Sequence, residues 1–163
     1  MTSRLDRRRR TISAPDGPPP LRGRAVRSVR FQEVDSMGVV WHGRYPEFLE
    51  DGRTAVGRAF GLDYVDFYRE RLKAPIVRLE IEYRAPLVLG DTFRVETSLL
   101  WTEAVRLDHE YEIRRELDGL IIAEARTVQL LLDADDRLCV LWPEYFRRFR
   151  EDWRLGRLRS GDG

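Results

Sequence analysis

The sequence predicts an α+β fold in which one long helix packs on an antiparallel sheet of five to six strands. Residues 44–60 place their apolar side chains at helical spacing, with Gly52 on the same stripe. Residues 77–132 instead alternate apolar and polar side chains, which is the period of half-buried strands. One helix cannot cover so wide a sheet, so we expect a second copy of the chain to cover the rest.

Before the long helix, alternation predicts a strand over residues 24–31 and then a loop over residues 32–43. Within the helix, Gly52 has no side chain and would permit close packing against the sheet. Gly61 suits the left-handed residue that often ends a helix. Residues 63–72 are polar and aromatic, and we expect a second short helix there.

The rest of the chain predicts further strands and a closing helix. The expected strands are residues 77–83, 93–101, 105–113, 120–132 and a short 138–141. Asp118 and Gly119 are a hairpin signal before the stretch 120–132, which is apolar on both faces in places. That stretch should therefore lie centrally in the sheet or at a subunit contact. Pro143 can open a C-terminal helix that runs through Trp153.

Composition divides the chain into a basic N-terminal arm over residues 1–23, a domain over residues 24–155 and a flexible tail over residues 156–163. The arm is rich in Arg, Pro and Gly without apolar periodicity, so we expect it to be disordered. Residues 1–30 hold nine arginines and two aspartates, a charge of +7 against +1 for the whole chain. The remainder carries −6, and an acidic body argues against nucleic acid as the main partner.

Three features lead us to expect a cytoplasmic protein. No apolar run is long enough to cross a bilayer, so no membrane span is predicted. The arginines at residues 7–10 are followed by a proline-rich stretch rather than by the apolar segment that an export signal needs. Cys139 is the single cysteine and cannot form an internal disulfide.

The chemistry is expected in residues 34–45, where Asp35, Gly38 and His42 come directly before the long helix. A helix N-terminus presents unsatisfied backbone N–H groups and a partial positive charge. These donors can polarise a carbonyl and hold the oxyanion that forms when it is attacked. A nearby carboxylate can attack the same carbon or take a proton from water. Gly38 and Gly43 would let the backbone turn and let substrate approach closely.

These residues match a known pattern. Asp-x-x-Gly-x-Val-x-His-x-x-Tyr over residues 35–45, followed by Glu50 and Arg53, resembles the 4-hydroxybenzoyl-CoA thioesterase family of hotdog proteins. It is most similar to the branch of acyl-CoA thioesterases associated with the Tol–Pal system. Residues 83–87 with residues 90–91 resemble that family's strand–turn signature. The resemblance implies a hotdog fold, in which the antiparallel sheet wraps the long helix.

The resemblance also implies hydrolysis of acyl-CoA to a free acid and coenzyme A, without a metal or another cofactor. Asp35 would act as nucleophile or general base. The backbone N–H of His42 or Gly43 would polarise the thioester, and the His42 imidazole could orient water or substrate. Hotdog thioesterases form homodimers or homotetramers with active sites between chains, so we expect one of these assemblies here.

The predicted substrate-binding residues are Gly38, Val40, Tyr45 and Arg84. Tyr45 would line the acyl pocket or buttress the turn. Arg84 is a candidate partner for the phosphates of coenzyme A, which need cations. Trp41 and Met37 depart from the family's usual residues, which affects the expected acyl group more than the reaction.

Two alternative functions stay open. The enzyme could release products from an acyl-carrier protein, with the basic arm contacting the acidic carrier. The chain could instead be a non-catalytic hotdog module that binds acyl ligands.

Glu50 and Arg53 are three apart on the helix, so an ion pair is expected. His109 shares the apolar phase of its strand and should be buried or interfacial.

Overall fold

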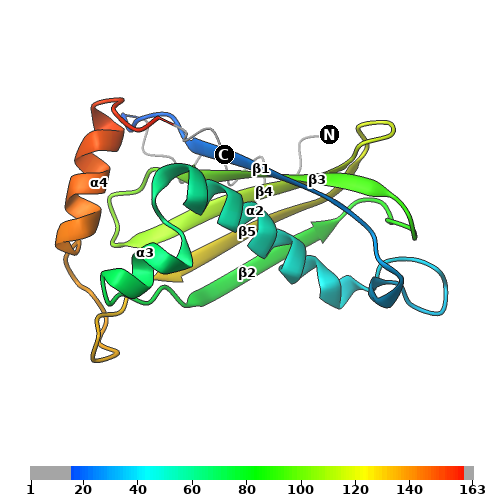
Figure 1. Cartoon of the computed structure of the whole chain (residues 1–163), viewed down its shortest axis with the longest axis horizontal. Helices are drawn as coiled ribbons and strands as arrows, with labels where there is room; N and C mark the ends of the chain where they lie inside the picture. Colours follow the sequence, from blue (N-terminus) through cyan, green and yellow to red (C-terminus); the bar gives the residue numbers. More distant parts are fainter. Residues whose placement is uncertain (1–15, 160–163) are drawn as a thin grey trace.

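The computed structural model describes residues 16–159, and its centre is one antiparallel sheet in the order β1-β3-β4-β5-β2 (Figure 1). Its five strands are β1 (Leu21–Ser28), β2 (Ile76–Tyr83), β3 (Thr92–Leu100), β4 (Arg106–Arg115) and β5 (Ile121–Leu130). The long helix α2 (Tyr45–Phe60) lies across one face of this sheet and packs mainly on β1 and β3. The α+β architecture expected from the two periods is confirmed.

Shorter helices flank this pair of layers. The 3₁₀ turns η1 (Phe31–Glu33) and η2 (His42–Arg44) precede α2, which ends at the left-handed Gly61 with φ 79°. Helix α3 (Tyr64–Arg69) follows, and α4 (Glu144–Arg154) closes one end of the sheet (Figure 1). Among the described residues, no helix is long and apolar enough to cross a membrane.

Helix α2 approaches the sheet closely because Gly52 faces β3. A Cβ atom added at Gly52 would stand 2.2 Å from Thr97 Oγ1 and 2.7 Å from the Val95 side chain. The flanking Phe48 and Val56 are almost fully buried, so the helix cannot tilt away without exposing apolar surface. The close packing expected at Gly52 is therefore confirmed.

Several boundaries differ from the sequence prediction. The first strand spans Leu21–Ser28 rather than residues 24–31, because the 3₁₀ turn Phe31–Glu33 carries the chain away from the sheet. The predicted arm boundary at residue 23 therefore falls inside β1, while residues 1–15 lie outside the described part. Leu138 makes one isolated bridge to Leu132, so the short strand predicted at residues 138–141 is wrong. The tight turn before Leu138 brings the chain back beside Leu132, where only one residue pair forms a bridge.

Strand β2 forms one edge of the sheet and is more exposed than the predicted half-buried strand. Val77 and Leu79 are 55% and 41% exposed. The edge position explains this, because β5 is the one described strand that pairs with β2. Near the other terminus, Leu158 packs against a core cluster, and residues 160–163 of the predicted tail lie outside the described part.

Substituting Gly52→Ala should destabilise the protein by about 1–3 kcal/mol, because the new methyl group overpacks the α2–β3 contact. Urea unfolding followed by circular dichroism measures this change in the free energy of unfolding. Arg58→Ala on the exposed face of the same helix is the matched control and should change it by less than about 0.5 kcal/mol. Equal stability of Gly52→Ala and the wild type would show that the helix can move away from β3 at no cost.

Candidate active site

The loop between β1 and α2 folds back on itself as a small hairpin that carries Asp35. The Trp41 N–H donates to the Glu33 carbonyl at 2.9 Å, and the Asp35 N–H donates to the Val39 carbonyl at 2.8 Å. At the tip, the Gly38 N–H donates to the Asp35 carbonyl at 3.0 Å. Gly38 has φ 77°, a conformation that favours glycine. Hydrogen bonds thus fix the position of Asp35 relative to the residues that start the helix.

The Asp35 carboxylate is half-buried and only partly engaged. Its Oδ1 accepts the Met37 N–H at 2.8 Å, which is an Asx turn at the hairpin tip. No other residue of the described part donates a hydrogen bond to this carboxylate. One oxygen therefore holds the turn, and Oδ2 is left for another partner.

The turn into α2 presents free backbone donors. His42 and Gly43 are the first two residues of the 3₁₀ turn η2, so their N–H groups have no acceptor inside it. The Trp41 ring lies against Gly43, where an added Cβ would stand 2.2 Å from a ring carbon. At the other side, the Tyr83 hydroxyl donates to the His42 carbonyl at 2.8 Å. The turn is thus held from β2, and no described residue accepts the N–H of His42 or Gly43.

Asp35 and these donors lie at the same end of the molecule. Asp35 lies two residues beyond Glu33, which is hydrogen-bonded to Trp41. Two residues of extended chain span about 7 Å. His42 directly follows Trp41 and is exposed. The large side chains of Met37 and Trp41 are 80% and 49% exposed beside them. The carboxylate and the two N–H donors are therefore carried by one short loop between β1 and α2.

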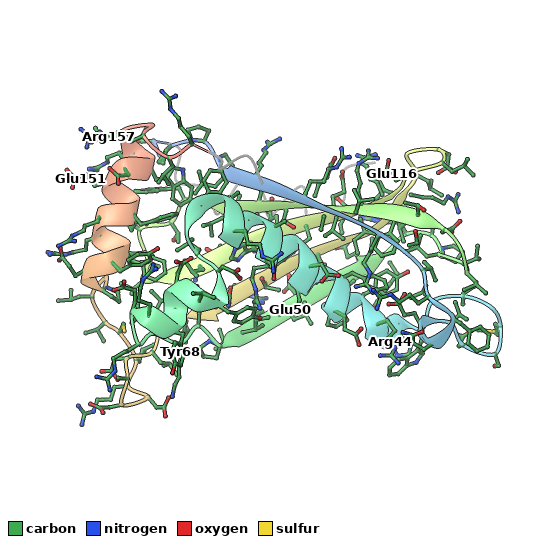
Figure 2. The ribbon with its side chains drawn as sticks, viewed as in Figure 1. Arg44, Glu50, Tyr68, Glu116, Glu151 and Arg157 are labelled. Carbon is green, nitrogen blue, oxygen red and sulfur yellow. The ribbon has the colours of Figure 1, made fainter. Side chains whose placement is uncertain are left out.

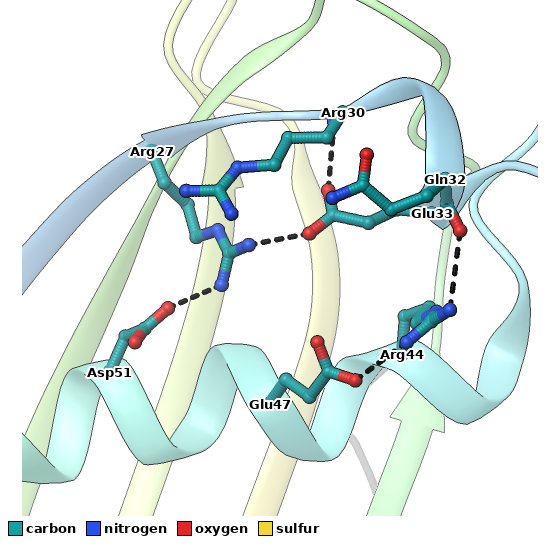
Figure 3. A network of polar contacts seen from close by, with 7 residues as sticks. All are labelled: Arg27, Arg30, Gln32, Glu33, Arg44, Glu47 and Asp51. Atoms are coloured by element: carbon teal, nitrogen blue, oxygen red, sulfur yellow. Dashed lines mark hydrogen bonds and ion pairs between the residues drawn. The ribbon is translucent and has the colours of Figure 1, made fainter.

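A buried ion pair holds this loop to the sheet and to α2 (Figure 3). Glu33 is 3% exposed, and it accepts hydrogen bonds from Arg27 Nη2 at 2.5 Å and from the Arg30 N–H at 2.8 Å. Arg27 also pairs with Asp51 on α2, and its guanidinium lies 4.7 Å from the centre of the Phe48 ring. One arginine therefore links strand, loop and helix.

Val40 and Tyr45, both predicted to bind substrate, are buried supports of the loop. The Val40 N–H donates to the Leu87 carbonyl at 2.9 Å, and its side chain belongs to the core. The Tyr45 ring is 3% exposed and packs edge-on against Tyr83 at 4.9 Å. Burial and the neighbouring Tyr83 raise the pKa of Tyr45 to about 12, so the phenol stays neutral. Of its two expected roles, the described contacts fit the buttress.

Arg84 is placed away from the other candidate residues. Its guanidinium bonds Glu124 at 2.7 Å and Glu82 at 2.6 Å. Tyr83 pairs with the core residue Ala123, so the neighbouring positions 82 and 124 face the opposite side of the sheet from α2. The structure therefore brings six of the seven predicted residues to one end of α2 and leaves Arg84 on the other face.

A cavity of about 740 Å³ lies elsewhere, beneath the C-terminal half of α2 and beside α3. None of the predicted site residues lines it. Glu50 on α2 and Tyr68 on α3 mark two of its walls (Figure 2). Sequence reasoning missed this cavity, although it had singled out Glu50, Arg53 and His109, which all line it.

Polar groups on the cavity wall form a defined network. The expected ion pair between Glu50 and Arg53 is confirmed, and the Tyr64 hydroxyl donates to Glu50 at 2.6 Å. His109 is 3% exposed, as expected for a buried residue. Burial and the positive charge of Arg53 lower the pKa of His109 to about 3, so its imidazole is neutral at physiological pH. Within residues 16–159, no group of three or more His, Cys, Asp or Glu could hold a metal ion.

Fold and loop together define a hotdog protein with a carboxylate-bearing loop in front of its long helix. A family model described as the Thioesterase-like superfamily matches residues 29–149. The chain therefore belongs to the Thioesterase-like superfamily, and its class is that of the thioester hydrolases.

Individual relatives agree with this assignment. The putative acyl-CoA thioesterase YneP of Bacillus subtilis is 30% identical over 125 residues, which cover 77% of this chain and 87% of the relative. The 1,4-dihydroxy-2-naphthoyl-CoA hydrolase of Synechococcus elongatus is 27% identical over 131 residues, covering 78% and 90%. The solved DHNA-CoA thioesterase of Staphylococcus aureus superposes with a TM-score of 0.73 at 23% identity, covering 81% and 88%, and shows the fold alone.

Substituting Glu33→Gln should loosen the loop, because it removes the charge that Arg27 faces in a nearly dry site. Breaking one partner of such a pair costs about 3 kcal/mol. Urea unfolding measures the loss, and hydrogen exchange should show faster exchange at the Trp41 N–H. Glu47→Gln is the matched control, because Glu47 pairs with Arg44 at the exposed start of the helix. Equal losses in both variants would contradict the special role of Glu33.

Proposed function

We propose that this chain hydrolyses an acyl-CoA thioester to a free acid and coenzyme A, with Asp35 at the chemical centre. The observation that supports the proposal is the hydrogen-bonded hairpin that joins Asp35 to the turn of His42 and Gly43, whose N–H groups have no acceptor among the described residues. The resemblance to the 4-hydroxybenzoyl-CoA thioesterase family and its Tol–Pal-associated branch supports it, as does the name of the YneP relative. We place the reaction in the cytoplasm, which agrees with the free thiol of Cys139.

The reaction would use the backbone N–H donors of the turn and the Asp35 carboxylate. The thioester carbonyl accepts hydrogen bonds from the His42 or Gly43 N–H, which stabilise the negative oxygen of the tetrahedral intermediate. Asp35 Oδ2 either attacks the carbonyl carbon or takes a proton from the attacking water. In the first case coenzyme A leaves as the thiolate, and water then hydrolyses the mixed anhydride and regenerates the carboxylate. Gly38 gives the hairpin tip its shape without a side chain near the substrate.

We further propose a homodimer in which the β2 edges of two copies pair in antiparallel fashion, which two such dimers could extend to a homotetramer. Within residues 16–159 the edge strand has no partner on its outer side, and it exposes Leu79, which faces the α2 side of the sheet. Ile76 at the start of β2 lines the large cavity, whereas Tyr83 at its end contacts His42. Antiparallel pairing about the middle of β2 therefore places the cavity of one copy beside the Asp35 hairpin of the other.

Asp35→Asn should lower kcat by at least about 100-fold, because the amide can still accept the Met37 N–H but is neither nucleophile nor base. Thiol release from a panel of acyl-CoA thioesters measures turnover. Asp118→Asn is the matched control, since Asp118 accepts the Leu120 N–H in the same kind of turn at another hairpin.

Three outcomes would redirect the proposal. Equal turnover by Asp35→Asn and the wild type would remove Asp35 from the chemistry. If the wild type hydrolysed only a thioester on an acyl-carrier protein, the carrier protein would replace coenzyme A as the substrate. Tight binding of acyl-CoA without any turnover would indicate a binding module.

Leu79→Asp should convert the dimer to a monomer and lower turnover at dilute concentration, because the charge would be buried at the paired edge. Sedimentation velocity measures the assembly. Leu117→Asp is the matched control, since Leu117 is 88% exposed in the turn between β4 and β5. A wild-type chain that is monomeric and fully active would overturn the dimer.

A further inference from the structure

The sheet has a second face, which is turned away from α2. Val95 and Thr97 of β3 meet α2, and side chains alternate along a strand, so the residues between them point the other way. Strand pairing places the even-numbered residues of β3 and β4 on this second face, together with those of β5 from Glu124 on. The described helices lie elsewhere, with α2 and α3 in front of the sheet and α4 at one end (Figure 1). Among residues 16–159, no helix therefore covers the second face.

Several side chains of the second face are nevertheless buried within the single chain. Asp108 is fully buried, and Glu124, Arg126 and Val128 are each less than a tenth exposed. A bare face of an antiparallel sheet would leave charged side chains such as these in water. Strand β5 is thus buried on both faces, although α2 lies on only one of them. We take this burial to indicate a further segment of the chain above the second face.

The segments outside the described part are residues 1–15 and 160–163. The second of these is short, because four residues span at most about 14 Å. The first leads into β1 through a fixed anchor, where the Trp153 indole N–H donates to the Pro19 carbonyl at 2.9 Å. Fifteen residues of extended chain span about 50 Å. The four strand spacings from β1 to β2 are about 19 Å, so residues 1–15 can cross the whole sheet.

A hollow of about 720 Å³ on the second face adjoins this anchor. Its lining includes Pro20, which directly precedes β1, and Arg24, Ser98 and Glu112 on the neighbouring strands β1, β3 and β4. The hollow therefore extends from the point where residues 1–15 join the sheet toward its middle, as a bed for an extended chain would.

A row of glutamates crosses the second face. Strand register places four of them directly opposite one another on neighbouring strands: Glu96, Glu112, Glu124 and Glu82. Like charges in such positions destabilise a sheet. Within residues 16–159, three arginines bond the four carboxylates, namely Arg94, Arg114 and Arg84. Arg106 and Arg126 face Asp108 instead. Further cations above the row would offset its repulsion.

Residues 1–15 supply such cations. They contain five arginines and one aspartate, a charge of +4, whereas the rest of the chain carries −3. Four of the arginines are consecutive, at residues 7–10. Residue 10 can lie about 17 Å from residue 15 in extended chain. Strands β4 and β5 lie about 10–14 Å from β1, so these arginines can reach Glu112 and Glu124.

We propose that residues 1–15 run across the second face of their own sheet, with the arginines at residues 7–10 above the row of glutamates. Composition predicted disorder for this arm because it has no core of its own, and the sheet supplies the surface that it lacks. The docked segment closes the second face to other copies of the chain and leaves the β2 edge for assembly. It also withholds its arginines from an acidic carrier protein. The proposal is independent of the thioesterase function, and its tests do not use turnover.

The first test measures how fast trypsin cleaves after residues 7–10, relative to a free synthetic peptide of residues 1–15. A docked segment is cut only while it is open, so we expect cleavage of the whole chain to be at least about 10-fold slower. Glu112→Gln combined with Glu124→Gln should remove most of this protection. Glu144→Gln combined with Glu151→Gln is the matched control, because it makes the same change of charge on the exposed side of α4, and it should keep the protection.

The second test locates the segment by chemical coupling. Lys73 is the single lysine of the chain, so Arg8→Lys introduces one new side-chain amine into residues 1–15. A carbodiimide joins an amine to a carboxylate in contact with it, and mass spectrometry identifies the carboxylate. We expect coupling to Glu112 or Glu124. A mixture of isotope-labelled and unlabelled chains distinguishes coupling within one chain from coupling between copies.

Each outcome decides part of the proposal. Cleavage of the whole chain as fast as the free peptide would overturn it, as would coupling to carboxylates of α4 or of the Asp35 hairpin. Coupling between labelled and unlabelled chains alone would assign the second face to a second copy. Protection that survives in the Glu112→Gln and Glu124→Gln variant would contradict the role of the row. If circular dichroism shows that this variant is unfolded, the coupling sites on the unaltered second face still decide the question.

Discussion

The buried carboxylate of Glu33 is the fixed point between the sheet and the loop that carries Asp35. Its side chain binds Arg27 on β1, while its backbone carbonyl accepts the Trp41 N–H. Since Arg27 also pairs with Asp51, the same contact reaches α2. Taking both charges out of water is costly, and only good geometry with further hydrogen bonds offsets that cost. The loop is thereby confined to one arrangement relative to the helix.

The two ends of the long helix contact different regions of the molecule. Its N-terminal end holds the polar loop, whereas its C-terminal half covers the apolar cavity with Glu50 and Arg53 on the wall. Within one chain these two regions share no lining residue, because Gly52 and its neighbours pack tightly on β3 between them. In the proposed dimer, the loop of one chain and the cavity of the other would together form one site.

The sequence predicted most features that depend on local pattern and few that depend on distant partners. Helix α2 and its end at Gly61 follow from side-chain period and from one backbone conformation, so they were predictable. The start of β1 at Leu21 depends on packing against residues far along the chain and was missed. The same holds for Arg84, whose partner Glu124 is forty positions away, and for the cavity, whose walls come from separate elements.

The hydrogen bond from Tyr83 to the His42 carbonyl links the last residue of an edge strand to the 3₁₀ turn η2 before α2. A partner that orders this edge would also restrict the peptide group between His42 and Gly43, whose nitrogen is one of the free donors. Association energy and oxyanion geometry would then be thermodynamically linked. In the proposed dimer, dissociation would leave every group of the loop in place but would remove the contact that makes the loop rigid.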